Sequence, residues 1–435
     1  MKTIANRYLE ITQKLSELSG NKVLTCLFFL IYKGILDLIY LKFVGDAYAY
    51  FGICISPVNI ASGWLITIIM AVVFSEYYKG NTASSVMMVV FNMFYFIPMT
   101  TYCSYGGGSS SFLFWGIIYW ALLTILQLRL PVIAWGRSGQ SEMSAKSIFL
   151  FTAIAAVPVV YVWVRYAKCR LLLNFGEIYQ VRAEAAGYGL STPLHYLLNM
   201  MPIVLALLIV LALSRRQYIA LIILLGLVFI NFSIAGHKTV IFFPFILIGG
   251  YIFYRKEMIS MILPGGILVE LAAIAEQFLG KGLIINLLFR RMGFVLAQLS
   301  EFYYRFFSGS SIDFFRQGII GKLGFDTIYS QSIANVIGNN FETQVVNCNN
   351  GIMADAWANL GLIGIFVMPV VLVYCMRFLD FASHNVNSRL IIGMIVYYSF
   401  AFANSQWSTV LITHGFALMC ILLMFFPREQ SRKNR

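Results

Sequence analysis

The chain has 435 residues, of which 60% are hydrophobic and 11% charged, and its mean hydropathy is +0.80. A soluble domain carries about a quarter charged residues, so this composition excludes an ordinary soluble protein and indicates a polytopic membrane protein. The net charge of +13 is interpreted as membrane topology and contact with anionic headgroups, and not as nucleic-acid binding. The seven cysteines are scattered, which predicts neither a disulfide framework nor a metal site.

Hydropathy divides the chain into membrane spans, because a spanning helix needs about 20 apolar residues. The pattern predicts an all-α polytopic protein with about twelve such helices, in a single integral-membrane domain over residues 1–435. The expected spans are 22–42, 56–76, 84–104, 110–128, 147–166, 194–213, 217–233, 239–254, 258–278, 352–376, 388–403 and 407–426. Within the first span, Lys33 and Asp37 lie one helical turn apart and are expected to form an ion pair.

Charge sets the expected topology. With the N-terminus in the cytoplasm, every inner segment is basic, as Lys79, Arg215 and Arg377 illustrate. Outer turns such as 103–111 and 403–409 carry no lysine or arginine. This distribution follows the positive-inside rule and predicts that both termini are cytoplasmic.

Two outer segments are basic and are the predicted extracytoplasmic loops: 167–193 and the larger 279–351. The charge rule applies mainly to short loops, so a long loop can be basic without changing the topology. The second loop is rich in Phe, Tyr, Gly and Asn, which favours an ordered segment. The charges either solvate a surface or form an extracytoplasmic site for an anion.

Residues 286–309, NLLFRRMGFVLAQLSEFYYRFFSG, have helical periodicity. One stripe carries the charged and polar side chains, which are Arg290, Arg291, Gln298, Glu301 and Arg305. This predicts an interfacial or bundle-packed helix with one solvated basic face. Arginine suits a diphosphate because its planar fork donates two parallel hydrogen bonds. The alternative is arginine snorkelling, with a Glu301–Arg305 pair.

The remainder of this loop is rich in asparagines, which offer both donors and an acceptor to sugar hydroxyls. They are Asn339, Asn340, Asn347, Asn349 and Asn350. Tyr303, Tyr304 and Tyr329 are candidates for stacking on sugar rings. Ordinary turn chemistry is the alternative for each asparagine.

Asp355 lies about one turn inside the apolar run of NCNNGIMADAWANLGLIGIF (347–366), where a charge is costly unless it has a partner or faces water. Asn359 shares its helix face, while Gly361 and Gly364 allow a neighbouring helix to pack closely. We expect Asp355 to face a solvated cleft, as a general base or as the partner of an arginine. The alternative is a carboxylate stabilised by the helix dipole.

A short outer turn in SIAGHKTVIFFP (233–244) places Lys238 at a helix N-terminus, where the dipole favours anions. His237 is a candidate for proton transfer, and helix capping is its alternative. Together with Arg182 of the first outer loop, Lys238 is a candidate for binding an anion.

The segment from Arg290 to Gly364 resembles the bacterial O-antigen (oligosaccharide repeat unit) polymerase family, the Wzy proteins. The resemblance lies in RRMGFVLAQLSEFYYRFFSG, IGNNF and NNGIMADAWANLGLIGIF. The matching features are a basic residue leading an aromatic-ended helix, an Asn-Gly approach, an acidic position before an aromatic residue, and N-x-G-x-x-G. In this sequence they are Arg290 and Arg291, Tyr303–Phe307, Asn350 and Gly351, Asp355 and Trp357, and Asn359, Gly361 and Gly364. The turn bearing Lys238 is a weaker likeness.

The resemblance implies a membrane glycosyltransferase of the lipid-donor, GT-C-like type in a bacterial inner membrane. It would transfer a growing chain from one undecaprenyl diphosphate to the non-reducing end of a repeat unit on another, at the extracytoplasmic face. It implies no cofactor, and a chain-length regulator is a further expected partner.

The implied catalytic residues are Asp355, Arg291 and Arg290. The implied substrate-binding residues are Arg182, Lys238, His237, Tyr303, Tyr304, Arg305, Asn350 and Asn359.

Three other functions fit less well. A lipid-linked oligosaccharide flippase would spread polar residues through many spans, whereas here they gather in the outer loops. An O-antigen ligase has a histidine near the start of the helix that follows its long loop, where this chain has Asp355. A membrane-bound acyltransferase needs a catalytic histidine in a polar helix, and none is found.

Overall fold

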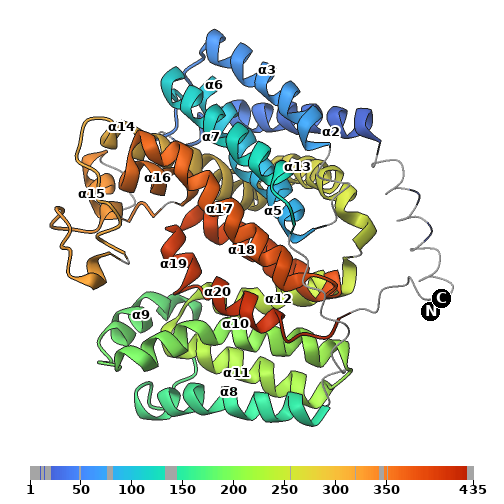
Figure 1. Ribbon diagram of the computed structural model, residues 1–435, viewed down its shortest axis with the longest axis vertical. Coiled ribbons are helices and arrows are strands. Elements are labelled where there is room, and N and C mark those ends of the chain that lie inside the picture. Colours follow the sequence, from blue (N-terminus) through green and yellow to red (C-terminus); the bar gives the residue numbers. More distant parts are fainter. Residues whose placement is uncertain are drawn as a thin grey trace. The chain divides into compact units, whose positions relative to one another are not determined.

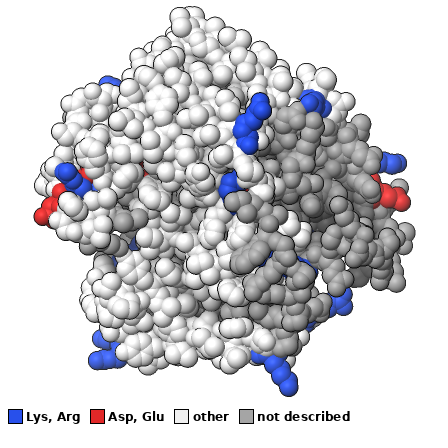
Figure 2. All heavy atoms as spheres, in the orientation of Figure 1, with Lys and Arg blue, Asp and Glu red and all other residues white. Residues whose placement is uncertain are grey.

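The protein is described from a computed structural model, which covers residues 21–48, 50–75, 82–132, 145–254, 256–318, 320–341, 347–349 and 351–428, together with Glu10 and Lys14. Every regular element in these residues is a helix, and they contain no strand. Much of the surface in view carries neither positive nor negative side chains (Figure 2). The protein is therefore an all-α, polytopic membrane protein.

Nine helical segments in the described residues are long and apolar enough to cross a membrane. They are Lys22–Val44, Pro57–Phe74, Ala83–Tyr105, Ser110–Arg129, Lys146–Arg165, Thr192–Ser214, Tyr218–Ala235, Ile259–Phe278 and Leu362–Ser383. The first eight coincide with predicted spans, whereas Leu362–Ser383 overlaps only the second part of the predicted span 352–376. The remaining predicted spans are shorter helices here: α12 (Lys238–Phe253), α18 (Ser388–Asn404), and the pair α19 (Trp407–Leu411) and α20 (Phe416–Leu423).

The chain packs as two compact units, each described here by itself. Unit 1 comprises Met1–Val132, Lys256–Asp380 and Tyr398–Ser408, and unit 2 comprises Ile133–Arg255, Phe381–Tyr397 and Thr409–Arg435. The single integral-membrane domain stays a prediction.

Unit 1 contains the first four apolar segments and most of the long loop. Its elements are α2 (Lys22–Ile39) with η1 (Tyr40–Val44), α3 (Pro57–Phe74), α5 (Ala83–Phe91) with η2 (Asn92–Phe96) and α6 (Ile97–Tyr105), α7 (Ser110–Arg129), η4 (Lys256–Met261), α13 (Ile262–Phe278), η5 (Ile285–Phe294), α14 (Val295–Phe307), η6 (Gly321–Leu323), α15 (Ile333–Asn340), α16 (Ile352–Leu360) and most of α17 (Leu362–Ser383) (Figure 1). In the apolar stretch of Ala83–Tyr105, 94% of the residues are buried, against 28–56% in the other candidate spans. This helix is therefore the centre of unit 1.

Unit 2 is built around α8 (Ala145–Arg165), α10 (Thr192–Ser214) and α11 (Tyr218–Ala235), which pack on one another (Figure 1). The predicted first outer loop contains η3 (Phe175–Glu177) and α9 (Ile178–Ala186), and α9 packs on α11. This loop is therefore ordered on the bundle.

Two buried ionic networks hold the helices of unit 1. Lys33 forms the predicted ion pair with Asp37, and Thr101 of α6 hydrogen-bonds to both. That prediction is confirmed.

The second network is centred on Arg377 and Asp380 of α17, whose charged groups are 3.0 Å apart. Asp380 accepts hydrogen bonds from the N–H and hydroxyl of Ser84, at 2.8 and 2.5 Å. Arg377 donates to the carbonyl oxygens of Gln127 and, at 2.6 Å, Leu130. This network joins α17 to α5 and α7.

Candidate functional site

Asp355 lies on α16, outside the nine candidate spans, and is 2% exposed. Its Oδ1 accepts a hydrogen bond from Asn359 Nδ2 at 2.7 Å, and its Oδ2 accepts one from the backbone N–H of Trp407 at 2.9 Å. Burial raises the pKa of Asp355 to about 7, although both hydrogen bonds act to lower it. The carboxylate therefore fastens α16 to the N-terminus of α19.

Asn359 connects the same helix to the long loop. Its Oδ1 accepts the N–H of Phe315 at 2.7 Å, and the N–H of Asp313 donates to the carbonyl of Ala358 at 2.8 Å. Asp313 is itself fully buried and accepts hydrogen bonds from Gln317 and Thr327. The loop after α14 is thus held on α16 by a continuous set of bonds.

The predicted span 352–376 is wrong as one helix, because α16 and α17 meet at Gly361. This residue has φ 56° and ψ −136°, which cannot continue a helix. A side chain at Gly364 would meet the backbone of Ala356. These glycines therefore form a bend between α16 and α17. Gly364 lies against α16 itself, and not against a third helix.

The start of α16 is equally constrained. A Cβ at Gly351 would meet the carbonyl oxygen of Phe402 and, at 2.6 Å, that of Ser405. Ile352 follows with φ 40°, which is strained for a β-branched residue. The described residues show no solvated cleft around Asp355, since Asp355 and Asn359 are buried and Trp407 is half-buried.

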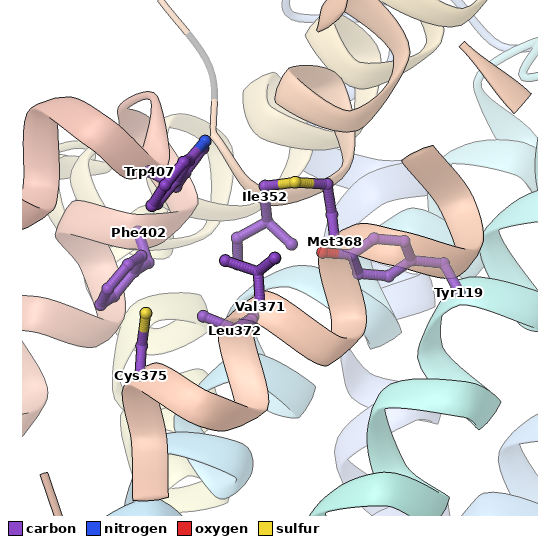
Figure 3. A pocket seen from close by; sticks show the side chains of 8 residues that line it. All are labelled: Tyr119, Ile352, Met368, Val371, Leu372, Cys375, Phe402 and Trp407. Carbon is purple, nitrogen blue, oxygen red and sulfur yellow. The ribbon is translucent and has the colours of Figure 1, made fainter. Parts of the chain in front are cut away.

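A small apolar pocket lies next to these residues (Figure 3). Its lining residues come from five helices and are Tyr119, Ile352, Met368, Val371, Leu372, Cys375, Phe402 and Trp407. No charged side chain lines it, so it has no group to bind an anion.

The predicted amphipathic helix 286–309 is a π-helix, η5, followed by α14. A π-helix turns less per residue than an α-helix, so the residues that follow it rotate away from the expected stripe. Gln298 and Glu301 are buried, and Glu301 accepts the N–H of Ser109 at 2.8 Å. The single solvated face is therefore wrong for these two residues.

The three arginines of the stripe have different surroundings. Arg290 is half-buried; its Nε donates to Asn286 at 2.7 Å, its Nη1 donates to the hydroxyl of Tyr50, and its guanidinium lies 4.5 Å from the ring centre of Tyr48. Arg291 is exposed. Arg305 is exposed and lies 5.3 Å from the ring centre of Phe341.

The predicted sugar-stacking tyrosines are largely packed. Tyr303 is buried and donates to the carbonyl of Cys348 at 3.1 Å. Tyr304 is half-buried, with its ring 4.9 Å from that of Trp357. Asn350 lies outside the described residues.

In unit 2, Arg182 is half-buried and its Nε donates to the carbonyl of Gly236 at 3.1 Å. Gly236 ends α11, His237 follows and is exposed, and Lys238 begins α12. Arg182 of the predicted first outer loop is therefore close to the backbone at the turn that carries His237.

The predicted site residues thus form three groups. Asp355, Asn359, Tyr303 and Tyr304 lie around α16, and Arg182 and His237 lie in unit 2. Arg290 and Arg291 are at the other end of the η5–α14 rod from Tyr304, about 20 Å away along a helix. Tyr48, Tyr50 and Trp407 were not predicted from the sequence, although the stretch AYAYFG after the first span was a usable signal for the two tyrosines.

No group of His, Cys, Asp or Glu in the described residues is arranged to hold a metal ion. No protein family matches the sequence, and comparisons with curated proteins and with solved structures find no similar protein.

Proposed function

We propose that the protein is a polymerase of lipid-linked oligosaccharides. It joins undecaprenyl-diphosphate-linked repeat units into O-antigen or a related surface polysaccharide, at the extracytoplasmic face of a bacterial inner membrane. In this proposal both termini are cytoplasmic and about twelve helices cross the membrane.

One observation carries the proposal: each unit has an arginine site on a predicted outer loop. Arg290 and Arg291 form the site in unit 1, and Arg182 beside the turn of His237 forms the site in unit 2. A polymerase must hold two lipid diphosphates, that of the donor and that of the acceptor. Arginine is suited to both, because its charge is permanent and its fork matches phosphate oxygens.

The proposed reaction is a glycosyl transfer. A hydroxyl at the non-reducing end of the acceptor attacks the anomeric carbon of the donor chain, and the bond from that carbon to the diphosphate oxygen breaks. The hydroxyl loses its proton to a base, and the diphosphate leaves with the bonding electrons. Arginines at the leaving diphosphate stabilise its developing charge without a metal or a nucleotide.

Asp355 acts in this proposal as a positioning residue. A pKa near 7 would suit a general base. Both oxygens, however, accept hydrogen bonds inside a packed region. Its contacts favour the role of holding α16, α19 and the long loop in one arrangement.

Deletion of the gene, followed by gel analysis of the host's surface polysaccharide, tests the proposal. Loss of the long ladder with a single repeat still on its anchor supports a polymerase, because translocation and transfer persist. Loss of every repeat, including the single one, supports a flippase or a ligase instead.

Complementation tests the residues. We expect Arg291→Ala and Asp355→Ala to leave the ladder absent, and Arg165→Gln, an exposed arginine at the end of α8, to restore it. Membrane levels of each variant, measured by immunoblot, separate loss of activity from loss of protein. A normal ladder from both test variants would contradict the site assignment.

A further inference from the structure

The loop after the first membrane helix presents two tyrosines beside the arginines of unit 1. The rings of Tyr48 and Tyr50 are 5.9 Å apart, and Tyr50 is 43% exposed. Beneath them, Phe51 is buried and packs on Tyr40 and Tyr102, with ring centres 6.0 and 6.4 Å apart. The loop therefore has an aromatic anchor inside and an aromatic surface outside.

Polar contacts fix the orientation of this surface. Arg290 donates to the hydroxyl of Tyr50 and covers the ring of Tyr48, while Gln298 Nε2 donates to the carbonyl of Tyr50 at 2.6 Å. An interfacial tyrosine belt, the plainest alternative, needs no such contacts, because it anchors in headgroups through its amphipathic rings.

The surroundings supply a second, independent observation. Two π-helical segments meet here: η1 ends just before the loop, and η5 carries Arg290 and Arg291. They touch through Tyr40 and Phe294, whose ring centres are 4.9 Å apart. π-Helical turns are rare in proteins, and those that do occur are often found at functional sites.

The arginines keep hydrogen-bonding capacity for a ligand. The bonds from Arg290 to Asn286 and Tyr50 use Nε and Nη1, which leaves Nη2 without a partner among the described residues. Arg291, the next residue, is exposed. A guanidinium has five N–H donors, so the pair can bind phosphate oxygens while Arg290 still holds the loop.

We propose that this surface binds the junction between sugar and diphosphate of a lipid-linked saccharide. The diphosphate lies on Arg290 and Arg291, and the first sugar ring lies on Tyr48 and Tyr50. An aromatic ring packs on the C–H face of a pyranose. The sugar is bonded directly to the diphosphate, so a ligand on the arginines places its sugar next to the tyrosines. This inference rests on the proposed function for its ligand, but it assigns the sugar to tyrosines outside the long loop.

Binding to the purified full-length protein tests the inference. The probes are undecaprenyl diphosphate alone and undecaprenyl diphosphate carrying one N-acetylglucosamine, with the fraction bound measured by native mass spectrometry. We expect the wild type to bind the sugar-bearing lipid about tenfold more tightly than the bare lipid.

Tyr48→Leu and Tyr50→Leu, made singly, should bring this ratio close to one while bare lipid still binds. Tyr50→Phe keeps the ring and should keep the ratio, whereas Arg291→Gln should weaken binding of both lipids. Tyr218→Leu, at an exposed tyrosine in unit 2, is the matched control and should behave as wild type. Because each tyrosine is tested separately, poor folding of one variant leaves the other as the test.

A wild type that prefers the sugar-bearing lipid, with leucine variants that keep the full preference, overturns this inference and leaves the polymerase proposal intact. The expected ratios combined with a normal polysaccharide ladder after gene deletion would support the binding surface and reject the polymerase. A wild type that binds both lipids equally also overturns the inference.

Discussion

Unit 1 contains two groups of polar residues that were both predicted to be solvated. The structure buries one group, around Asp355, and leaves part of the other, around Arg290, exposed. Around Asp355, both carboxylate oxygens and the Asn359 oxygen accept hydrogen bonds from the protein, and the Asp355 and Asn359 side chains are buried. Around Arg290, the contacts hold a loop in place but leave Arg291 and Tyr50 at the surface. A saturated buried network specifies structure, whereas an oriented and exposed one can take a ligand.

The difference predicts unequal responses to mutation. Substitutions around α16 should act mainly on folding, and substitutions around Arg290 should act mainly on binding.

Gly351→Ala should have the largest effect on folding. Its new Cβ would collide with the backbone carbonyls of Phe402 and Ser405, and backbone atoms cannot rotate away. We expect no monodisperse protein in size-exclusion chromatography after detergent extraction. Gly309→Ala, where the added carbon meets no atom within 4 Å, is the control and should give normal yield. Equal yields from both variants would show that the start of α16 is not essential for folding, and would contradict the difference proposed between the two groups.

Asp355→Ala should be the next most damaging change. It leaves the N–H of Trp407 without its acceptor, at a cost of about 1–3 kcal/mol in unfolding free energy, and removes one of the two acceptors of the Asn359 amide, which still donates to the backbone carbonyl of residue 355. A fluorescent thermal-shift assay in detergent should show a clearly lower transition temperature than wild type. An unchanged transition temperature with no ladder would instead make Asp355 a catalytic residue.

Asp355→Asn sharpens this test through pH. The folded-state pKa of about 7 lies above the unfolded value of about 3.9, so the folded protein binds the proton more tightly. Stability contributed by the protonated carboxyl is present below pH 4 and is lost as the pH rises through 7. The transition temperature of wild type relative to Asp355→Asn should therefore fall between pH 4.5 and 7.5. A constant difference would show that the carboxylate is ionised throughout.

Arg290→Gln should have the smallest effect on folding. It removes a partly exposed cation–π contact and two charged hydrogen bonds, to Asn286 and Tyr50, which together contribute on the order of 1 kcal/mol because the guanidinium is partly solvated. We expect a thermal-shift transition within a few degrees of wild type, together with a weakened ladder. A variant that fails to fold would place Arg290 with the structural network and remove the contrast.

Local sequence patterns were sufficient for some features. Lys33 and Asp37 are one turn apart in an apolar helix, so each needs a partner and the nearest is the other. The apolar runs likewise predicted eight of the nine long helices, all but Leu362–Ser383, because their signal is length and composition alone. Such features depend on neighbours in the sequence.

Features that depend on distant contacts were not predictable. The N–H that binds Asp355 belongs to Trp407, which comes from a different predicted span. The rotation of Gln298 and Glu301 out of the expected stripe follows from a π-helix, for which no periodicity rule gave warning. The break at Gly361 was present in the sequence but was interpreted as a packing feature, since a glycine alone does not reveal its φ angle.

Helix α17 is held within unit 1 at both of its ends. At one end Gly361 joins it to α16, which is bound to α19 and to the long loop, and at the other end Arg377 and Asp380 bind α5 and α7. A helix that is bonded to its neighbours at both ends neither tilts nor slides easily. In the proposed polymerase, the movements that admit a long saccharide and release a longer one would then come from the loops of unit 1. Chain growth, in the proposed polymerase, would then be a cycle of loop opening on a frame that stays fixed within unit 1.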